Sequence, residues 1–296
     1  MDHGRLISNS EVTTWVTCQR RYYYTYDLKL RPKVYSAPLS RGLIGHEVLQ
    51  AYYSALQSGA SKSAAIQVAK SVMQTYGNSA DFDLVFELSA ILDNYWNMVD
   101  DSDWEILGVE NQHELDLGWG ANYVMRYDLL VRIKSLNQIA IVDHKFVYDF
   151  WSNDDVALSP QFPKYMACLR GLGIDVKRCI LNQLRYRPIK KENQTVDKLF
   201  NRAVQIPTVA KMQNALMEQR NATMEILAHR ELPIERRMEK TSANRNKITC
   251  RGCSVKELCL SQYDGGDVSY LIDTQFEVNE QYGYNNEIAS EIESKF

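Results

Sequence analysis

Two acids and a lysine lie in apolar, strand-like segments in the middle of the chain. Asp128 follows the alternating segment Tyr123–Tyr127, and Asp143 and Lys145 belong to a second such segment, Ile139–Phe146. Residues two apart on a strand point to the same face, and antiparallel pairing would bring Asp128 to that face. Two carboxylates and an ammonium group gathered there suit a divalent cation beside a phosphate, because buried charges need partners. Taken alone, the Asp-x-Lys pair is more typical of a surface ion pair at a strand end.

The six cysteines divide into two groups. Two of them, Cys168 and Cys179, lie among apolar residues and are expected in the core. The other four are Cys18, Cys250, Cys253 and Cys259. The last three form a C-x2-C-x5-C cluster, and thiols this close in a cytosolic chain indicate metal ligation before disulfides. A site with four thiolates needs one more ligand, and Cys18 is the remaining cysteine outside the predicted core.

Zinc and an iron–sulfur cube both accept four thiolates. Zinc ribbons usually contain two C-x2-C pairs, whereas this chain has one pair and two single cysteines. The asymmetry favours a [4Fe–4S] cluster, and zinc stays open as the alternative.

Periodicity predicts the elements that must position these residues. Helices are expected within residues 11–26, 41–53, 61–76, 84–99, 160–172 and 206–230. Strands are expected within residues 104–117, 123–134, 138–147 and 176–186. The order helix, three strands, helix, strand indicates an α/β core preceded by helical insertions. Residues 240–263 read as a basic, cysteine-bearing loop region, followed by a poorly ordered or loosely docked tail.

Composition excludes several classes of protein. The chain has 296 residues, 45% of them hydrophobic, and no apolar run long enough to span a membrane, so a cytoplasmic globular protein is expected. A formal net charge of −3 argues against a strongly basic nucleic-acid coat protein, although basic stretches occur at residues 19–33 and 240–251. The sequence has no Gly-x-x-x-x-Gly-Lys loop and no Gly-x-Gly-x-x-Gly after a strand, so no nucleotide cofactor is expected.

An ordered series of motifs carries a resemblance to a known family. The series is Ser10-x7-Cys18 followed by Arg21-Tyr-Tyr-Tyr24, then Arg41-Gly-x3-His46, Asp128, Asp143-His-Lys145, Gln161-x3-Tyr165, and finally Cys250, Cys253 and Cys259. Between Ser8 and Leu260 the chain resembles the PD-(D/E)XK nucleases of the RecB-like branch. It is most similar to the iron–sulfur exonucleases associated with CRISPR loci and to their phage relatives.

The resemblance implies a restriction-endonuclease-like fold with an αβββαβ core around a central mixed sheet. It implies a helical N-terminal region over residues 1–103, a nuclease core over 104–235, a cysteine region over 236–263 that packs on the N-terminus, and an acidic tail over 264–296. All four parts are expected to form one compact catalytic unit.

The resemblance also implies roles for the site residues. His46, Asp128 and Asp143 would ligate Mg²⁺ or Mn²⁺, with the backbone carbonyl of His144 as a further ligand; imidazole with carboxylates suits Mn²⁺ and tolerates Mg²⁺. Lys145 would lie beside the attacking water, favouring hydroxide and stabilising charge on the scissile phosphate. The His144 side chain is expected on the face opposite Asp143 and Lys145.

Other positions receive supporting roles by the same resemblance. Gln161 and Tyr165 share a helix face and would hold the DNA strand or position the catalytic acids. Glu110 would support the site, and Arg41 would contact phosphate or brace the helix of His46. The family usually has a glycine where Met125 stands, a departure that removes no ligand.

These expectations lead to a metal-dependent DNA nuclease. The resemblance implies an exonuclease that acts on single strands or DNA ends in repair or recombination, with a helicase or recombinase as a candidate partner and a structural [4Fe–4S] cluster formed by the four cysteines. Most of the aromatic rings of Tyr22–Tyr26 are expected in the core rather than stacked on bases. Two alternatives stay open, namely a non-catalytic DNA-binding or scaffold protein with a nuclease-like fold and a nuclease stapled by zinc.

Overall fold

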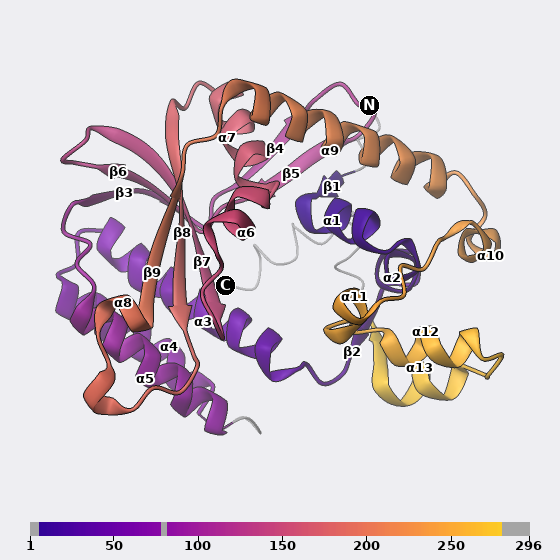
Figure 1. Cartoon of the computed structure of the whole chain (residues 1–296), viewed down its shortest axis with the longest axis horizontal. Helices are drawn as coiled ribbons and strands as arrows, with labels where there is room; N and C mark the ends of the chain where they lie inside the picture. The colour runs from indigo at the N-terminus through magenta and orange to yellow at the C-terminus, as the bar shows by residue number, and fades with distance from the viewer. Residues whose placement is uncertain (1–5, 78–81, 280–296) are drawn as a thin grey trace, which may run out of the picture. The chain divides into compact units, whose positions relative to one another are not determined.

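The computed structural model describes residues 6–77 and 82–279, and the chain divides into two compact units. Unit 1 comprises residues 1–35, 114–125 and 217–296, and unit 2 comprises residues 36–113 and 126–216. Both units are discontinuous along the chain, whereas the boundaries expected from the sequence follow chain order. Figure 1 traces the elements of both units by colour in chain order.

Unit 2 contains a central mixed sheet of five strands in the order β3-β6-β7-β8-β9. The strands are β3 (Trp104–Val109), β6 (Leu129–Ile133), β7 (Gln138–Val147), β8 (Val176–Arg185) and β9 (Phe200–Gln205). The β7–β8 pair is parallel, and the pairs β3–β6, β6–β7 and β8–β9 are antiparallel. A mixed α/β fold around a central mixed sheet is therefore confirmed, and β9 is an edge strand that the sequence analysis did not predict.

Helices cover both faces of this sheet (Figure 1). The helices are α3 (Ala37–Gln57), α4 (Lys62–Thr75), α5 (Phe82–Met98), α6 (Asn153–Leu158), α7 (Gln161–Gly171), α8 (Val196–Leu199) and the short 3-10 turn Lys191–Asn193. Apolar residues of α3, α4 and α5 form one buried cluster with the sheet. Within β7, Ala140 and Val142 face that cluster, whereas Asp143 faces α7 through a contact with Gln161. The period of two along β7 thus separates a core face from a polar face.

Helix α3 approaches the sheet closely at Gly45, the residue before His46. A Cβ atom at Gly45 would lie 2.2 Å from a ring carbon of Phe146 on β7. At Gly42, one turn earlier, a Cβ atom would meet nothing within 4 Å. The missing side chain at Gly45 therefore sets how near His46 comes to the strands.

Two of the predicted strands are each broken in two. The segment expected at 104–117 is β3 followed by β4 (Gln112–Asp116), and the segment expected at 123–134 is β5 (Asn122–Arg126) followed by β6. The first break falls at Glu110, whose φ of 51° lies in the left-handed region, and the second falls at Asp128. Extended geometry cannot continue through the positive φ of Glu110, so the backbone turns there, and residues 127–128 lie between β5 and β6, outside both strands.

Unit 1 is built from elements that are far apart in the sequence. A three-stranded sheet in the order β1-β5-β4 contains β1 (Leu6–Ser8), and β2 (Leu30–Pro32) pairs antiparallel with β10 (Phe276–Val278). The helices are α1 (Asn9–Thr17), α2 (Gln19–Tyr22), the π-helical turn Tyr23–Asp27, α10 (Ile234–Arg237), the 3-10 turn Met238–Lys240, α11 (Lys247–Arg251), α12 (Lys256–Tyr263) and α13 (Ser269–Gln275). Helix α9 (Val209–Arg230) begins in unit 2 and ends in unit 1.

The C-terminal part of unit 1 corrects two expectations. The cysteine-bearing region was expected to be a loop but contains α11 and α12; the Asn246 side chain caps α11 by accepting from the Thr249 backbone N–H at 2.8 Å. The tail was expected to be poorly ordered or loosely docked from residue 264. Up to residue 279 it instead forms α13 and β10, with Phe276 buried against Leu258, and residues 280–296 lie outside the described part.

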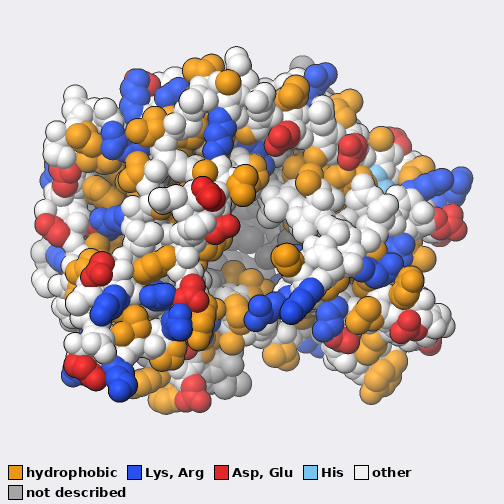
Figure 2. Space-filling model, viewed as in Figure 1, with side chains coloured by type: hydrophobic (Ala, Val, Ile, Leu, Met, Phe, Trp, Pro, Cys, Tyr) orange, Lys and Arg blue, Asp and Glu red, His pale blue; other side chains and the backbone are white. Residues whose placement is uncertain are grey.

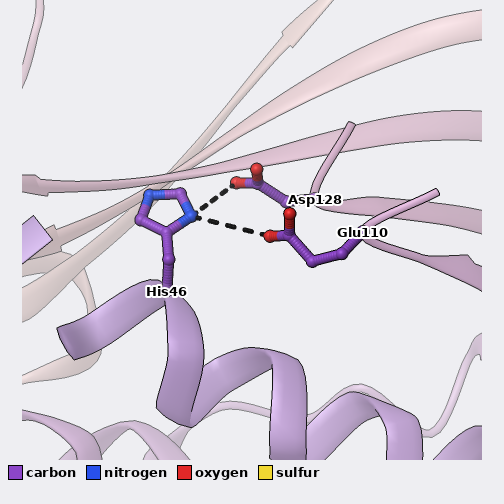
Figure 3. A group of neighbouring side chains, drawn as sticks. All are labelled: His46, Glu110 and Asp128. Carbon is purple, nitrogen blue, oxygen red and sulfur yellow. Dashed lines mark ion pairs between the residues drawn. The ribbon is translucent and has the colours of Figure 1, made fainter. Parts of the chain in front are cut away.

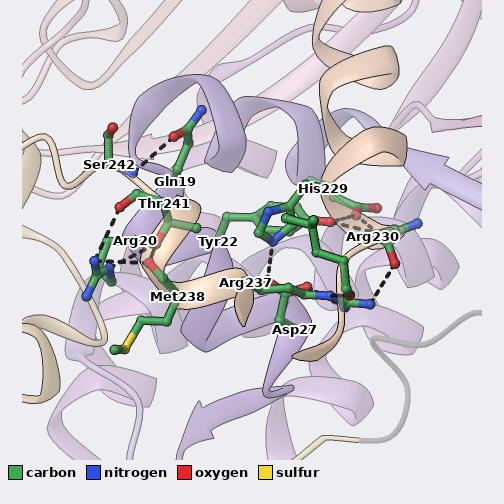
Figure 4. A network of polar contacts seen from close by, with 12 residues as sticks. Gln19, Arg20, Tyr22, Asp27, His229, Arg230, Arg237, Met238, Thr241 and Ser242 are labelled. Carbon is green, nitrogen blue, oxygen red and sulfur yellow. Dashed lines mark hydrogen bonds and ion pairs between the residues drawn. The ribbon is translucent and has the colours of Figure 1, made fainter. Parts of the chain in front are cut away.

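Polar contacts connect the first and last segments of unit 1 (Figure 4). The Arg20 guanidinium donates to the Met238 carbonyl at 3.2 Å and to the Thr241 hydroxyl at 3.0 Å. Asp27 accepts from His229 at 2.7 Å, and its other oxygen accepts from Arg237 at 2.8 Å. Such buried, paired charges hold the segments in one arrangement, since breaking a pair leaves an isolated buried charge.

The tyrosine run supports this packing. Tyr22 and Tyr24 are each at most 1% exposed, and the Tyr22 hydroxyl donates to Glu11 at 2.8 Å. The expectation that most of these rings are core residues is confirmed for these two.

Among the described residues, no helix is both long and apolar enough to cross a membrane.

The close approach at Gly45 yields a stability prediction. Gly45→Ala should lower the free energy of unfolding by about 1–3 kcal/mol, because Phe146 must shift within a packed interface. Gly42→Ala on the same helix should raise it by about 0.5–1 kcal/mol, because alanine favours helix and meets no neighbour. Urea unfolding followed by circular dichroism measures both values. Equal shifts for the two variants would contradict the packing described for α3.

Candidate active site in unit 2

Three side chains from separate elements of unit 2 meet at one end of the sheet (Figure 3). His46 extends from α3, Glu110 follows β3, and Asp128 precedes β6. His46 Nδ1 lies 3.3 Å from Asp128 Oδ2 and 4.0 Å from Glu110 Oε1. One ligand atom from each residue lies within 4.8 Å of the others, which is close enough to bind one metal ion.

The interruptions of the strands at Glu110 and Asp128 orient the two carboxylates. The Glu110 backbone N–H donates to the Asp128 carbonyl at 2.9 Å, so the two turns are bonded to each other. The Asp128 carboxylate also accepts from the backbone N–H of His144 at 2.6 Å, and Glu110 pairs with Arg126 at 3.1 Å. Each acid is therefore held by a bond to a neighbouring element or segment and leaves its carboxylate directed toward His46.

Asp143 and Lys145 form a second group on the face of β7 that packs against α7. Lys145 Nζ lies 2.7 Å from Asp143 Oδ2, and the Gln161 amide donates to Asp143 Oδ1 at 3.0 Å. Only 7% of the Asp143 side chain is exposed, whereas 33% of the Lys145 side chain is exposed. Asp143 is thus buried under its two partners, and Lys145 has access to solvent.

Tyr165 and the His144 side chain are both buried near this site. Tyr165 lies on α7, and burial together with the charge of Asp143 raises the pKa of its hydroxyl. The His144 ring stacks on Tyr53 with centroids 5.4 Å apart and contacts Asn182 through Nδ1 at 2.8 Å. These core contacts agree with the expectation that the His144 side chain lies opposite Asp143 and Lys145. Burial lowers the pKa of His144 to about 3, so its ring is neutral.

The carboxylates repel one another, and the pKa shifts reflect this. Burial and then the charge of Asp128 raise the pKa of Glu110. Burial also raises the pKa of Asp143, against the opposing charge of Lys145. Burial alone would raise the pKa of Asp128, but the hydrogen bond and charge of His46 lower it well below the usual value.

The pKa values of both basic partners, Lys145 and His46, are raised despite burial, because nearby negative charge favours their protonated forms. Burial alone would lower the pKa of Lys145, yet the charges of Asp143 and Asp128 raise it above the usual value. The hydrogen bond to Asp128 likewise raises the pKa of His46, against the effect of burial. Concentrated negative charge of this kind attracts cations, and an imidazole with two carboxylates is a suitable donor set for Mn²⁺ or Mg²⁺.

The structure brings together most of the residues singled out in the sequence, with one change in emphasis. Glu110, which was given only a supporting role, lies in the group that could bind a metal, whereas Asp143 is engaged by Lys145 and Gln161. Ligation by Asp143 and by the His144 carbonyl stays a prediction. A sequence signal for Glu110 did exist, because it is an acid at the end of an apolar strand, as Asp128 is before the next.

The four cysteines predicted to bind a cofactor lie in unit 1. They line one small cavity of about 60 Å³ together with Arg21, Arg245 and Lys256. Among the described residues, no three of their sulfur atoms lie within 4.8 Å of one another, so the thiols are not gathered as tightly as ligands of one ion. Cys168 and Cys179 are at most 3% exposed, as expected of core residues.

Residues 6–260 match a family model described as PD-(D/E)XK nuclease superfamily. No curated protein matches the chain. A solved structure titled a "putative exonuclease" from Eubacterium rectale is 12% identical, with a TM-score of 0.47, and the match covers 83% of this chain and 87% of that chain. A second, titled SSO0001, is 14% identical, with a TM-score of 0.35, covering 88% and 87% respectively.

The position of Glu110 yields a binding prediction. Glu110→Gln should weaken Mn²⁺ binding at least about tenfold, since the site loses one carboxylate charge and donor. Glu105→Gln is the matched control, because Glu105 lies on β3 five residues before Glu110 and makes an exposed ion pair with Arg132 at 3.0 Å. Calorimetric titration with Mn²⁺ measures the affinity of each variant. Wild-type affinity in Glu110→Gln would remove Glu110 from the metal group.

Proposed function

The chain belongs to the PD-(D/E)XK nuclease superfamily, and we propose that it is a Mg²⁺- or Mn²⁺-dependent deoxyribonuclease that acts as an exonuclease on single strands or DNA ends. The observation that carries the proposal is the pairing of two groups, His46 with Glu110 and Asp128, and Asp143 with Lys145. The first group suits a cation, and the second presents the ammonium group of Lys145, whose pKa is raised, against the effect of burial, by the charge of Asp143 and also by that of Asp128 in the first group.

The residues fit a divalent cation. His46, Asp128 and Glu110 supply one nitrogen and two carboxylate donors from three elements, and Asp143 is the further acid we propose as a ligand. When bound, the cation would act as a Lewis acid that neutralises phosphate charge and makes water more acidic. Close carboxylates repel each other without a cation, so binding relieves an unfavourable arrangement.

Lys145 is the proposed electrostatic catalyst. Its ammonium group is fixed by Asp143 at 2.7 Å and remains one-third exposed, so it can reach a phosphate at the surface of the site. A fixed positive charge favours the pentavalent, more negative transition state of phosphodiester hydrolysis over the ground state. The same charge stabilises a nearby hydroxide relative to water.

Gln161 and Tyr165 are proposed to position this pair. The Gln161 amide donates to Asp143, which leaves the other carboxylate oxygen for Lys145. Tyr165 is 6% exposed and lies one helical turn further along α7. Its burial supports a role in bracing the face of α7 rather than in direct contact with DNA.

Basic side chains of unit 1 offer contacts to the DNA backbone. Lys247, Arg251 and Lys256 line one shallow pocket with Cys250. Figure 2 shows Lys and Arg side chains gathered in the part of the view where α11 lies. Such contacts would be independent of base sequence and sensitive to salt. A helicase or recombinase partner and a role in repair or recombination, in a phage or a cell, are proposed on the sequence resemblance alone.

We also propose that the four cysteines bind a structural [4Fe–4S] cluster. Thiolates on one zinc ion, each about 2.3 Å from the metal, would be about 4 Å apart. Among the described residues no three of these sulfur atoms lie within 4.8 Å of one another, so their positions give no support to a single zinc ion. The cavity carries positive charge from Arg21, Arg245 and Lys256, which favours an anionic cluster. Buried Arg21 Nε has no hydrogen-bond partner among the described residues and is a free donor for it.

The active-site proposal predicts the behaviour of two variants. Asp143→Asn and Lys145→Gln should each reduce Mn²⁺-dependent cleavage of end-labelled DNA by at least about a hundredfold, because each removes a charge fixed at the site. The controls are Asp175→Asn and Lys177→Gln, since these residues form the same Asp-x-Lys pair at 2.8 Å on the exposed start of β8.

Circular dichroism should give the same spectrum for all four variants. Full cleavage by either Asp143→Asn or Lys145→Gln would defeat the assignment of the site. The assay also separates the enzyme from a DNA-binding scaffold, because a scaffold would bind the labelled DNA and leave it intact with either Mn²⁺ or EDTA.

The cluster proposal predicts a spectroscopic result. Protein purified without oxygen should contain roughly four iron atoms per chain and absorb broadly near ~400 nm. Cys18→Ala and Cys253→Ala should lose this absorbance, whereas Cys168→Ala, a buried core cysteine of unit 2, should keep it. A colourless protein that contains one equivalent of zinc would contradict the cluster and show that the cysteines bind a structural zinc ion instead.

A further inference from the structure

We propose that a pocket of unit 2, lined by Tyr148 just after β7, binds one unpaired nucleotide of the DNA strand, with its base stacked on Tyr148. The inference rests on the proposed function and deepens it, because it restricts the substrate to single-stranded DNA or a frayed end. The pocket has a volume of about 440 Å³, which is suitable for one small ligand.

The pocket is connected to the catalytic residues by short stretches of chain. Tyr148 follows the end of β7, three residues after Lys145, and Arg41 precedes His46 by five residues on α3. Three residues of strand extend about 10 Å, which is about three nucleotides of a stacked strand and fewer of an extended one. A strand held at the catalytic residues can therefore place a neighbouring nucleotide in the pocket.

Aromatic rings and guanidinium groups form the wall of the pocket. Tyr148 and Tyr186 have ring centroids 5.6 Å apart in an edge-to-face arrangement. The guanidinium carbon of Arg41 lies 3.8 Å from the centroid of the Tyr186 ring, and that of Arg187 lies 5.6 Å from the centroid of Tyr148. Arg41 thus occupies a face of Tyr186, while Tyr148 is 51% exposed and offers a flat apolar surface to a base.

Two amide side chains supply polar groups that could meet the edge of a base. Asn94 and Gln194 line the pocket and lie in contact through Asn94 Nδ2 and Gln194 Oε1 at 3.5 Å. Gln194 Nε2 also donates to the Ile189 carbonyl at 3.1 Å, which orients the amide. Donors and acceptors of this kind suit any of the four bases and give no strong sequence preference.

The charge of the pocket is positive but moderate. Arg41 pairs with Glu87 at 2.9 Å, and Arg185 and Arg187 share a single carboxylate oxygen of Asp149. Three guanidinium groups thus face two acids, so one positive charge is not balanced within this group. That charge suits the phosphate of the bound nucleotide, and the modest excess indicates that the ring contact carries much of the affinity.

The ring contact requires an unpaired base. In a duplex both faces of each internal base are covered by its neighbours in the stack, so away from the ends Tyr148 could stack only on a base that has left the helix. The pocket therefore distinguishes a single strand or a frayed end from intact double-stranded DNA.

The test measures DNA binding without divalent metal, so it does not depend on cleavage. Fluorescence anisotropy gives the affinity for a labelled single-stranded oligonucleotide in EDTA. Tyr148→Leu should weaken binding about tenfold, which corresponds to the loss of one base stacked on one ring. Tyr148→Phe keeps the ring and should bind within about twofold of the wild type. A tenfold loss of affinity, about 1.4 kcal/mol, is expected only when the ring itself is removed.

A second oligonucleotide separates the contribution of base contacts to the affinity from that of phosphate contacts. An oligonucleotide of equal length without bases should bind equally to wild type and Tyr148→Leu, whereas Arg187→Ala should weaken the binding of both strands. Arg132→Ala is the control, because Arg132 also makes an exposed ion pair, at 3.0 Å, but does not line the pocket. A blunt duplex should bind equally to wild type and Tyr148→Leu.

The outcomes distinguish this inference from the proposed function. Wild-type affinity for single strands in both Tyr148→Leu and Arg187→Ala would overturn the pocket, even if the enzyme cleaves DNA. Equal loss of affinity for the abasic strand and the normal strand in Tyr148→Leu would also overturn it, because stacking on a base would then be excluded. If the variants lose affinity as expected but wild type never cleaves DNA with Mn²⁺, the pocket stands and the nuclease assignment fails.

Discussion

Repulsion between acids in a partly buried space is the constraint around which unit 2 is organised. Glu110, Asp128 and Asp143 approach one end of the sheet, and each is held by a different partner. Without those partners the carboxylates would separate or take up protons, because desolvation and like charge both disfavour ionisation. The site thus keeps its negative charge through the surrounding fold, which is a condition for attracting a cation.

The parallel pairing of β7 with β8 and the close packing of α3 make this possible. The connection from β7 to β8 contains α7, which brings Gln161 over Asp143 on one face of the strand. On the other face, Gly45 allows α3 to reach Phe146, and His46 follows directly. One strand therefore determines the positions of groups on both sides of the sheet, because its side chains alternate.

Much of this arrangement could be predicted from residue types and spacing. The period of two placed Asp143 and Lys145 together and His144 opposite, and the helical pattern identified the segment that carries His46. The two breaks could not be read in the same way, because apolar alternation continues across Asp128 and a positive φ at a glutamate such as Glu110 has no sequence signature. For that reason Glu110 was placed beside the site rather than among its possible ligands.

Short elements that depend on distant partners were also missed. Strand β10 has three residues and is defined by its pairing with β2, which lies more than two hundred positions earlier. Local propensity carries little information about such a pair, because the stabilising contacts are not local. Strand β9 was not predicted either; it lies at the edge of the sheet and pairs with a single strand, β8.

The separation of contacts in unit 1 has a consequence for biosynthesis. Arg20 and Thr241 are 221 positions apart in the chain, yet their side chains bond to each other. At a translation rate of about 5–20 residues per second, the first helices would wait about 10–40 seconds on the ribosome for these partners. During that time Trp15 and Tyr22, each at most 5% exposed in the finished protein, would lack the residues of α9 that cover them. These apolar side chains therefore gain their native cover only after the C-terminal segments have been synthesised.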